Sequence, residues 1–355
     1  MTKTEIFLLK AFHGDAIIIK TVDTSGNPYT ILIDGGPSNT FDFALRKELS
    51  AISKLDLLIL THIDSDHIGG ILKFIDNSLF DKITIDKFWI NSPHLIPITD
   101  GSSKISAIQA GNLEKKLIDK KVELHKFSSL ITAVDTYSPK KGIEFTILSP
   151  TPHALDAVVK EWPELGSEHK AKLDDLKISG GVTNSQLPRG NLKDLAIADF
   201  KPGKSLDNDR FNSASIAFIL RLVDCTLLLL GDARAEIIEE SLIKLGYNST
   251  DNKLKVDFVK ISHHGSKNNT SSSLLDLIDC ENFIIMTNGG SARTKHPDRE
   301  TVARILYHPA RNLDNSIQIF LNYPLAEIEA KAGIFFTKEE LLNAKCSVLE
   351  NINQI

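Results

Sequence analysis

The chain has 355 residues, 42% of them hydrophobic and 25% charged, with a net charge of −5. A core of this size needs no disulfides, and three scattered cysteines exclude a small disulfide-rich scaffold. The sequence has no apolar run near the ~20 residues that a membrane helix requires, and its acidic balance excludes a surface that is basic overall. Because the N-terminus also lacks a signal-peptide core, we expect a cytoplasmic protein with no membrane partner. Its oligomeric state is left open.

Four strands and one helix are predicted in the first part of the chain. Apolar runs with β-branched residues predict strands over residues 6–9, 14–20, 29–33 and 55–60. Apolar residues at positions 41, 45, 49 and 52 have helical spacing and predict a helix before the fourth strand. The third strand ends at Asp34, and the two glycines that follow allow close backbone approach. Asp34 therefore either orders this turn or contacts a nearby site.

A dense group of polar side chains follows the fourth strand directly. His62, Asp64, Asp66 and His67 lie within six residues, and two glycines come soon after them. Imidazole and carboxylate groups gathered at one point suit one or two divalent cations. The alternative is a solvated polar turn, although four such groups behind a buried strand are rare by chance. The sequence therefore predicts a metal site at the end of this strand.

The middle of the chain carries weaker signals. Strands are predicted over residues 83–85, 88–90 and 143–148, and a helix over 105–121 ends in a basic stretch. That stretch is either a solvated face or an edge that contacts phosphate, and its lysines are Lys115, Lys116, Lys120, Lys121 and Lys126. Residues 153–210 have little hydrophobic periodicity, so we expect an insertion that forms a lid or a substrate wall.

The second half repeats one arrangement, in which a polar group follows a predicted strand. A hairpin over residues 215–222 and 226–230 ends before Asp232, and a strand over 256–261 ends before His263 and His264. A further strand over 283–286 comes before His296, and helices are predicted over 235–245, 271–278 and 296–307. Because strand ends can converge at one edge of a sheet, these groups and the earlier cluster argue for one shared site.

The last part of the chain predicts one more strand, over residues 316–321, with a hairpin partner near 333–336. Thr337 and Glu340 have the spacing of a capping box and predict the start of a final helix. We expect one domain over residues 1–330, interrupted by the insertion at about 153–210. A C-terminal strand and helix over residues 331–355 are expected to pack on that domain.

These motifs, in this order, resemble those of the metallo-β-lactamase fold superfamily. The stretch from Thr61 to Gly70 is similar to its signature, and the residues around Asp34, Asp232 and His263-His264 are similar to its other motifs. The segments 14–16, 211–215, 263–266 and 296–297 look most like the hydrolase domain of bacterial competence proteins (ComEC-like), here without their membrane part. The resemblance covers about residues 4–310 apart from the insertion. It implies an α/β fold: a four-layer αβ/βα sandwich with two mixed sheets and a dinuclear metal site at one edge.

The resemblance also implies a set of metal ligands. His62 and Asp64 would bind one cation, and Asp66 and His67 would bind the other, together with His263 or His264. Asp232 would bridge the two cations, which we expect to be Zn²⁺ or Mn²⁺. Many relatives have histidine at position 64, and an aspartate there adds a hard oxygen ligand that favours Mn²⁺. Asn212 stands where relatives carry another histidine, and an amide oxygen is a weak ligand.

A hydrolytic mechanism follows from that implied site. Hydroxide activated by the cations would attack phosphorus or a carbonyl carbon, and Asp66 would orient it. His296, or whichever of His263 and His264 is not a ligand, would protonate the leaving group. The residues expected to hold a phosphate are Lys260, Ser266 and Lys267. We expect a phosphodiesterase or nuclease acting on nucleic acid or a nucleotide-like substrate. The alternatives are hydrolysis of a lactone, thioester or β-lactam, and a non-catalytic metal-binding partner module.

Overall fold

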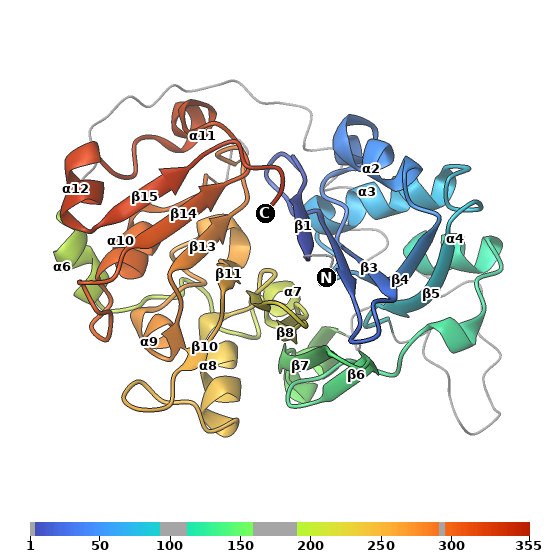
Figure 1. Cartoon of the computed structure of the whole chain (residues 1–355), viewed down its shortest axis with the longest axis horizontal. Coiled ribbons are helices and arrows are strands. Elements are labelled where there is room, and N and C mark those ends of the chain that lie inside the picture. The colour runs from blue at the N-terminus through green and yellow to red at the C-terminus, as the bar shows by residue number, and fades with distance from the viewer. Residues whose placement is uncertain (1–3, 93–111, 159–189, 291–294) are drawn as a thin grey trace.

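Two β-sheets pack face to face in the centre of the molecule, and helices cover the outer face of each (Figure 1). The computed structural model describes residues 4–92, 112–158, 190–290 and 295–355. One apolar cluster lies between the sheets, and one lies between each sheet and its helices. The predicted four-layer αβ/βα sandwich with two mixed sheets is therefore confirmed.

The first sheet has five strands in the order of the chain. Its strands are β1 Glu5–Leu8, β2 Ile17–Val22, β3 Pro28–Ile33, β4 Lys54–Ile59 and β5 Thr84–Trp89. The first three strands pair antiparallel, and β3, β4 and β5 pair parallel. Ile33 pairs with Ile59 at the ends of β3 and β4, so Asp34 and Thr61 leave the sheet side by side.

The helices of this half confirm the predicted spacing. They are α1 Ser38–Thr40, the π-helix η1 Phe41–Leu45, α2 Arg46–Ser50, α3 Ser65–Asp76 and α4 Asn112–Asp119. Phe41, Leu45 and Leu49, one helical turn apart, are all buried in the cluster under this layer. Only residues 112–121 of the helix predicted over 105–121 lie within the described part of the chain. The 3₁₀-helix η2 Leu124–Lys126 follows α4.

The second sheet has eight strands, ordered β15-β14-β13-β11-β9-β8-β7-β6. Their bounds are β6 Thr136–Lys140, β7 Ile143–Ser149, β8 Ala217–Arg221, β9 Thr226–Leu229, β11 Phe258–Lys260, β13 Asn282–Ile285, β14 Ile317–Leu321 and β15 Cys346–Leu349. Strands from β9 to β15 pair parallel, and β6 to β9 pair antiparallel, which confirms the hairpin of β8 and β9. Two short strands, β10 Leu254–Lys255 and β12 Ile278–Asp279, pair with each other outside this sheet.

Helices from several parts of the chain cover the second sheet (Figure 1). The helices of this half are α6 Leu192–Ile197, α7 Arg210–Ser213, α8 Ala235–Lys244, α9 Ser272–Asp276, α10 Arg299–Tyr307, α11 Leu325–Ala332 and α12 Lys338–Asn343. Leu192 and Ala196 of α6 are buried in the apolar cluster under this layer. The end of the stretch predicted as an insertion over 153–210 thus belongs to the helical layer, and residues 159–189 of that stretch lie outside the described part.

The predicted hairpin partner near 333–336 is wrong, because β14 pairs parallel with β15 instead. The capping box is confirmed: Thr337 accepts a hydrogen bond from the Glu340 N–H, and Glu340 accepts one from the Thr337 N–H. After β15 the chain crosses to the first sheet, where Ile6 N donates to Ile355 O over 3.0 Å and Leu8 N donates to Asn353 O over 2.9 Å. The C-terminal residues therefore join both sheets.

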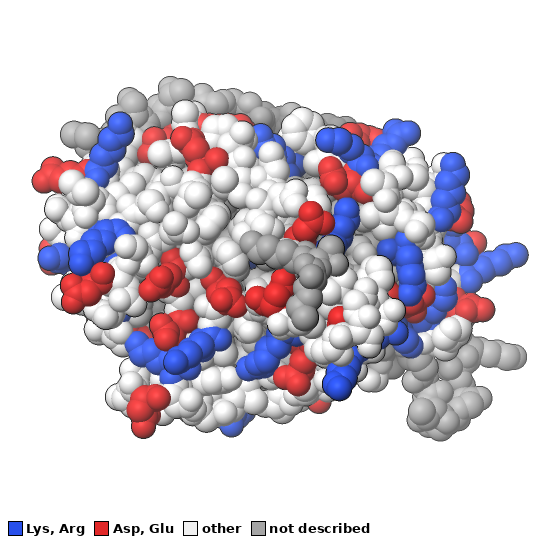
Figure 2. Space-filling model, viewed as in Figure 1, with Lys and Arg blue, Asp and Glu red and all other residues white. Residues whose placement is uncertain are grey.

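Charges of both signs are interspersed on the face shown in Figure 2. The lysines of the basic stretch follow the same pattern, since Lys116 pairs with Asp76 and Lys120 pairs with Asp81. These pairs favour the solvated-face interpretation of the stretch over an edge that contacts phosphate. Within the described residues, no helix is long and apolar enough to cross a membrane.

Candidate metal centre

Two glycine pairs, Gly35-Gly36 and Gly69-Gly70, bring the turn after β3 and helix α3 together. A Cβ at Gly70 of α3 would lie 2.0 Å from the carbonyl oxygen of Gly35, so only glycine allows this backbone contact. Gly35 N donates to His67 O, and Gly70 N donates to Gly36 O, each over 2.8 Å. The helix is thereby fixed against the turn that carries Asp34. Because α3 begins at Ser65, Asp66 and His67 lie in its first turn.

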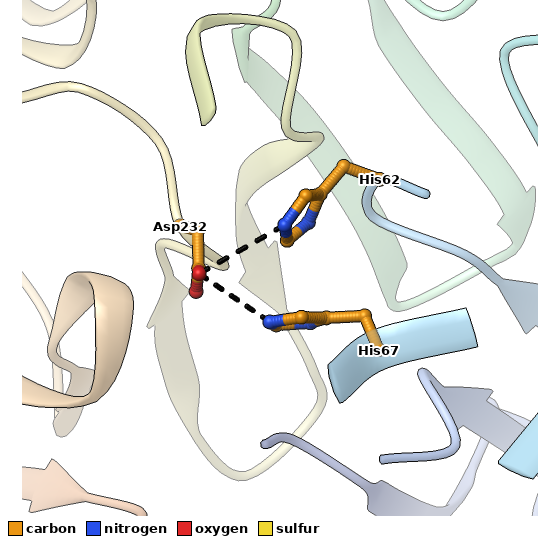
Figure 3. A group of neighbouring side chains, drawn as sticks. All are labelled: His62, His67 and Asp232. Atoms are coloured by element: carbon orange, nitrogen blue, oxygen red, sulfur yellow. Dashed lines mark ion pairs between the residues drawn. The ribbon is translucent and has the colours of Figure 1, made fainter. Parts of the chain in front are cut away.

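Four histidines from both halves of the molecule surround one carboxylate. The distance to Asp232 Oδ2 is 3.4 Å from His67 Nε2, 3.7 Å from His263 Nε2, and 3.8 Å from both His62 Nε2 and His264 Nε2. Figure 3 shows His62 and His67 pointing at Asp232 from the opposite side. The chain therefore brings its two predicted histidine pairs to one carboxylate, although about 200 residues separate them in sequence.

Each of these imidazoles is oriented through its other nitrogen, Nδ1. His62 contacts Thr61 Oγ1 over 3.1 Å, and His67 contacts Asp34 Oδ2 over 2.8 Å. His263 contacts Asn269 Oδ1 over 3.0 Å, and His264 contacts the carbonyl of Met286 over 3.1 Å. The Thr61 hydroxyl itself donates to Asp34, so it accepts from His62. All four rings thus carry a proton on Nδ1, so the neutral form of each has its Nε2 lone pair directed at Asp232.

Several buried atoms at this point have no hydrogen-bond partner among the described residues. They are Nε2 of His62, His67 and His264, and Oδ1 of Asp232. Unpartnered buried polar atoms are costly and rare, and here they gather around one point. Imidazole lone pairs and a carboxylate oxygen are the donors that Zn²⁺ and Mn²⁺ bind. The residues therefore fit a divalent metal centre.

Among the described residues, Asp15 takes part in two groups of donor atoms, and two overlapping groups contain predicted ligands alone. His62, His67 and Asp232 make one, and Asp66, His67 and His264 make the other, with all ligand atoms of each group within 4.8 Å of one another. Asp66 Oδ2 lies 3.5 Å from His264 Nε2. Asp64 is more peripheral: its carboxylate lies 3.7 Å from His62 Nε2, its side chain is 32% exposed, and it joins none of the three-donor groups.

The charges of the cluster reinforce one another. Although burial favours its neutral form, the nearby charges of His67, His263 and His264 hold the pKa of Asp232 well below its ordinary value. Burial lowers the pKa of His67, but Asp232 and Asp34 raise it well above the ordinary value. Burial also opposes the charge of His264, whose carboxylate neighbours raise its pKa to about 9. Protons and metal cations compete for the same Nε2 lone pairs, so cation binding here should release protons.

The two adjacent histidines of the second half lie in strained backbone. His263 has φ 48° and ψ 51°, and His264 has φ 55° and ψ 20°, within the turn η3 Ser262–Gly265. Left-handed backbone is unfavourable for residues other than glycine and is found at functional sites. This conformation directs the two side chains to different donors: both face Asp232, and only His264 also faces Asp66.

Two residues just before β8, Asn212 and Ser215, contact residues of the cluster. Ser215 Oγ accepts a hydrogen bond from Asp232 N over 3.1 Å. Asn212 lies beside His263, with Nδ2 3.5 Å from His263 Nδ1, and its amide oxygen has no partner among the described residues. Asn212 is thus close to the cluster, as expected for a weak ligand or a supporting residue.

His296 lies at the border of the cluster. Its ring centroid is 5.3 Å from that of His263, and its Nδ1 contacts Asp298 Oδ2 over 3.2 Å. Lys267 is near, since its N–H donates to Asp298, but its ammonium pairs with Glu300 over 2.9 Å. Ser266 is buried, and its Oγ accepts from Asn268 N, so its hydroxyl is occupied within the turn.

The structure contradicts the phosphate-binding role expected for Lys260. Its side chain is 1% exposed, and its ammonium donates to Asp15 and to the carbonyl of Gly231. The side chain points into the space between the sheets, because its partner Asp15 belongs to the other half of the sandwich. An ammonium enclosed in this way does not reach a substrate.

Sequence patterns did not place three further residues at the centre. Asn269 orients His263 and also donates to the carbonyl of Asp232 over 3.0 Å. His13 is half-buried, and burial lowers its pKa against the opposing effect of nearby Asp66. Asp15 contacts His264 Nδ1 over 3.4 Å. The sequence signal for Asp15 is the resemblance of segment 14–16 to the competence-protein domain. No sequence signal marks His13 or Asn269.

Three solved structures are similar over much of the chain. The metallo-beta-lactamase fold protein YhfI from Bacillus subtilis is 9% identical, with 99% of this chain and 98% of that chain covered and a TM-score of 0.40. Zn²⁺-bound PqqB from Methylobacterium extorquens is 8% identical, with 99% of each chain covered and a TM-score of 0.39. CmlA, a diiron beta-hydroxylase from Streptomyces venezuelae, is 11% identical, with a TM-score of 0.35. The similarity covers 100% of this chain and 54% of CmlA.

A comparison with curated proteins gave no match. A family model does match, and it covers residues 12–289, which is most of the chain. That span includes the glycine pairs, all four histidines around Asp232, and the carboxylates that contact them. On this match the chain belongs to the metallo-beta-lactamase superfamily.

Proposed function

We propose that this protein is a hydrolase that cleaves phosphodiester bonds with the help of two divalent cations. The observation that carries the proposal is the convergence of four imidazole Nε2 atoms on Asp232 Oδ2, within 3.4–3.8 Å. Asp232 Oδ2 lies within 3.8 Å of His62 and His67 in the first donor group and of His264 in the second, so this carboxylate is suited to bridge two cations. Bound there, such cations lower the pKa of water and stabilise negative charge that develops on the substrate.

The residues of the chain divide into three roles. His62, His67 and His264 would bind cations through their Nε2 lone pairs, and Asp232, which contacts all three, would bridge the cations. Asp66 contacts His264 and is the carboxylate placed to orient a nucleophile. His296 is the candidate proton donor for the leaving group, because Asp298 binds its Nδ1 and leaves Nε2 for proton transfer.

The choice of a phosphodiester substrate rests on two features of the sequence. The first is a resemblance to the hydrolase domain of competence proteins, which serve DNA uptake. It is carried by segments 14–16, 211–215, 263–266 and 296–297. Asp66 and Asp232 also add hard oxygen donors to the imidazoles, and the more peripheral Asp64 lies 3.7 Å from His62 Nε2, which favours Mn²⁺ alongside Zn²⁺. The net charge of −5 favours a short or nucleotide-like substrate over long duplex DNA, and the face shown in Figure 2 has charges of both signs interspersed.

One feature of the site suits both the proposed substrate class and the alternative of a carbonyl substrate. A small pocket beside His62 is mostly apolar, and its lining includes Ile63, Leu155, Val158 and Phe211. Such a pocket suits the acyl or ring portion of a lactone or thioester, and it equally suits the face of a nucleobase. The two substrate classes are separated by experiment.

A substrate panel is expected to show phosphodiester cleavage that depends on added metal. Purified protein would be treated with a chelator and reloaded with Mn²⁺, Zn²⁺ or Mg²⁺. It would then be assayed on bis-p-nitrophenyl phosphate, short single-stranded DNA, RNA, a cyclic dinucleotide and a lactone. Mn²⁺ is expected to give the highest rates on the phosphodiesters. Lactone turnover without phosphodiester cleavage under any metal would overturn the proposed substrate class.

His296→Asn is expected to lower kcat by about 10²–10⁴-fold on substrates with a poor leaving group, the usual effect of losing a general acid. The loss should be much smaller on bis-p-nitrophenyl phosphate, because nitrophenolate leaves without protonation. Metal content should not change, since His296 contacts Asp298 and the ring of His263 rather than Asp232. An equal loss on both kinds of substrate would contradict the assigned role.

A further inference from the structure

A buried ion pair joins the two halves of the sandwich beneath the metal centre. Lys260 ends β11 of the eight-stranded sheet, and Asp15 lies just before β2 of the five-stranded sheet. Lys260 is 1% exposed and Asp15 is 2% exposed. Removing two charges from water is costly, so a buried pair is weak evidence for stability alone. Its neighbours indicate a different role.

The pair contacts the chain segments that carry the ligand-type residues. Lys260 Nζ also donates to the carbonyl of Gly231 over 3.2 Å, directly before Asp232. Asp15 Oδ1 lies 3.4 Å from His264 Nδ1, and Asp15 N donates to the carbonyl of Asp66 over 3.3 Å. A Cβ at Gly14 would lie 1.9 Å from that same carbonyl, which shows how closely this loop approaches α3.

The two carboxylate oxygens of Asp15 contact different side chains. One oxygen accepts from the Lys260 ammonium. The other has no hydrogen-bond partner among the described residues and faces His264 Nδ1, which donates to the Met286 carbonyl. A negative charge beside that N–H favours the tautomer whose lone pair is on Nε2, and it makes that nitrogen a stronger donor. Asp34 stands in the same relation to His67.

We propose that Lys260 and Asp15 form a positioning unit that fixes His264 and the turn before Asp232 across the junction of the two sheets. Asp15 orients the imidazole, and Lys260 holds Asp15 in place while it anchors the Gly231 carbonyl. The unit keeps the donors of one half at a set distance from those of the other. The inference rests on the proposed use of divalent cations and not on the identity of the substrate.

Titration of the full-length, metal-free protein with Co²⁺ tests the unit, because the visible spectrum of Co²⁺ reports its ligand geometry. Asp15→Asn is expected to lower Co²⁺ affinity by about 10–100-fold and to change the spectrum, as for other residues that orient metal ligands. In the variant that combines Asp15→Asn with Lys260→Met, no charge is left unpaired in the interior. This variant should regain thermal stability, yet keep the weak affinity and altered spectrum.

The combined variant separates positioning from a purely structural role, even if Asp15→Asn alone does not fold. Wild-type affinity and spectrum in that variant would overturn the inference. A control is Asp276→Asn, because Asp276 contacts His308 Nδ1 over 2.7 Å in another, partly buried His–carboxylate pair, at the ends of helices α9 and α10 of the outer layer. It should lower stability and leave the Co²⁺ spectrum unchanged. A wild-type protein that binds no Co²⁺ would overturn the proposed function and this inference together.

Discussion

Asp232→Asn is expected to lower hydrolytic activity by at least about 10³-fold, since removing even one preorganised charge contact in an active site costs about 10²–10³. The substitution keeps the shape of the side chain and removes the charge on which four imidazoles converge. These imidazoles come from both halves of the sandwich, and all four Nε2 atoms lie within 3.8 Å of this carboxylate. Divalent cations should therefore bind more weakly, which metal analysis of the purified variant would measure.

Asp56→Asn is the matched control for this substitution. Asp56 is also buried, at 6% exposure, but it accepts from Thr30 N and pairs with Lys54, away from the histidines. This control should lose some thermal stability and keep its full metal content and activity. Wild-type metal content in Asp232→Asn would show that the cations bind elsewhere and that the cluster is not the metal centre.

The position of the site could be predicted because it depends on strand ends. The end of each buried strand is visible in the sequence, and the polar groups that follow share one edge once the sheets form. Asp34, His67 and Asp232 therefore come together although no local signal links them. The two mixed sheets follow from the same order of strands and helices.

The details that could not be predicted depend on contacts between the two sheets. Lys260 is close to the histidine turn in sequence, and we expected it to hold a phosphate. Its side chain instead meets Asp15, a residue 245 positions away, inside the sandwich. Nothing in the residues around Lys260 distinguishes these two directions. The position of Asp64 could not be predicted either. Its place among four ligand-type residues suggested a metal ligand, but it lies just before α3, which begins at Ser65, and at the border of the cluster.

The tail was mispredicted for a related reason. An apolar segment near 333–336 after β14 suggested a hairpin, yet Phe335 and Phe336 pack as side chains into the outer apolar cluster. The true partner, β15, pairs parallel and therefore needs a longer connection, here made by α11 and α12. Its sequence, Cys346 to Leu349, is short and only partly buried, so it carries little periodic signal.

Gly70→Ala is expected to destabilise the protein by about 2 kcal/mol, although alanine is the better helix former by about 1 kcal/mol. Gly70 lies in the interior of α3, where propensity alone predicts a gain in stability. The new Cβ, however, would lie 2.0 Å from Gly35 O and 2.8 Å from Gly35 C. Both atoms belong to backbone, which cannot rotate away as a flexible side chain can. The helix and the turn must therefore separate, and the clash outweighs the propensity.

That separation should reach the metal centre as well as the global stability. Gly35 directly follows Asp34, whose carboxylate orients His67 over 2.8 Å, so a displaced turn weakens the orientation of His67. Thermal melts with and without saturating Mn²⁺ should show a smaller metal-induced rise in Tm for Gly70→Ala than for the wild type. Lys73→Ala, on an exposed position of the same helix, should change stability by no more than about 0.5 kcal/mol and keep the full metal-induced rise. If Gly70→Ala were more stable than the wild type, the helix and the turn would not be in backbone contact, and the glycine pairs would have no part in holding Asp34 against His67.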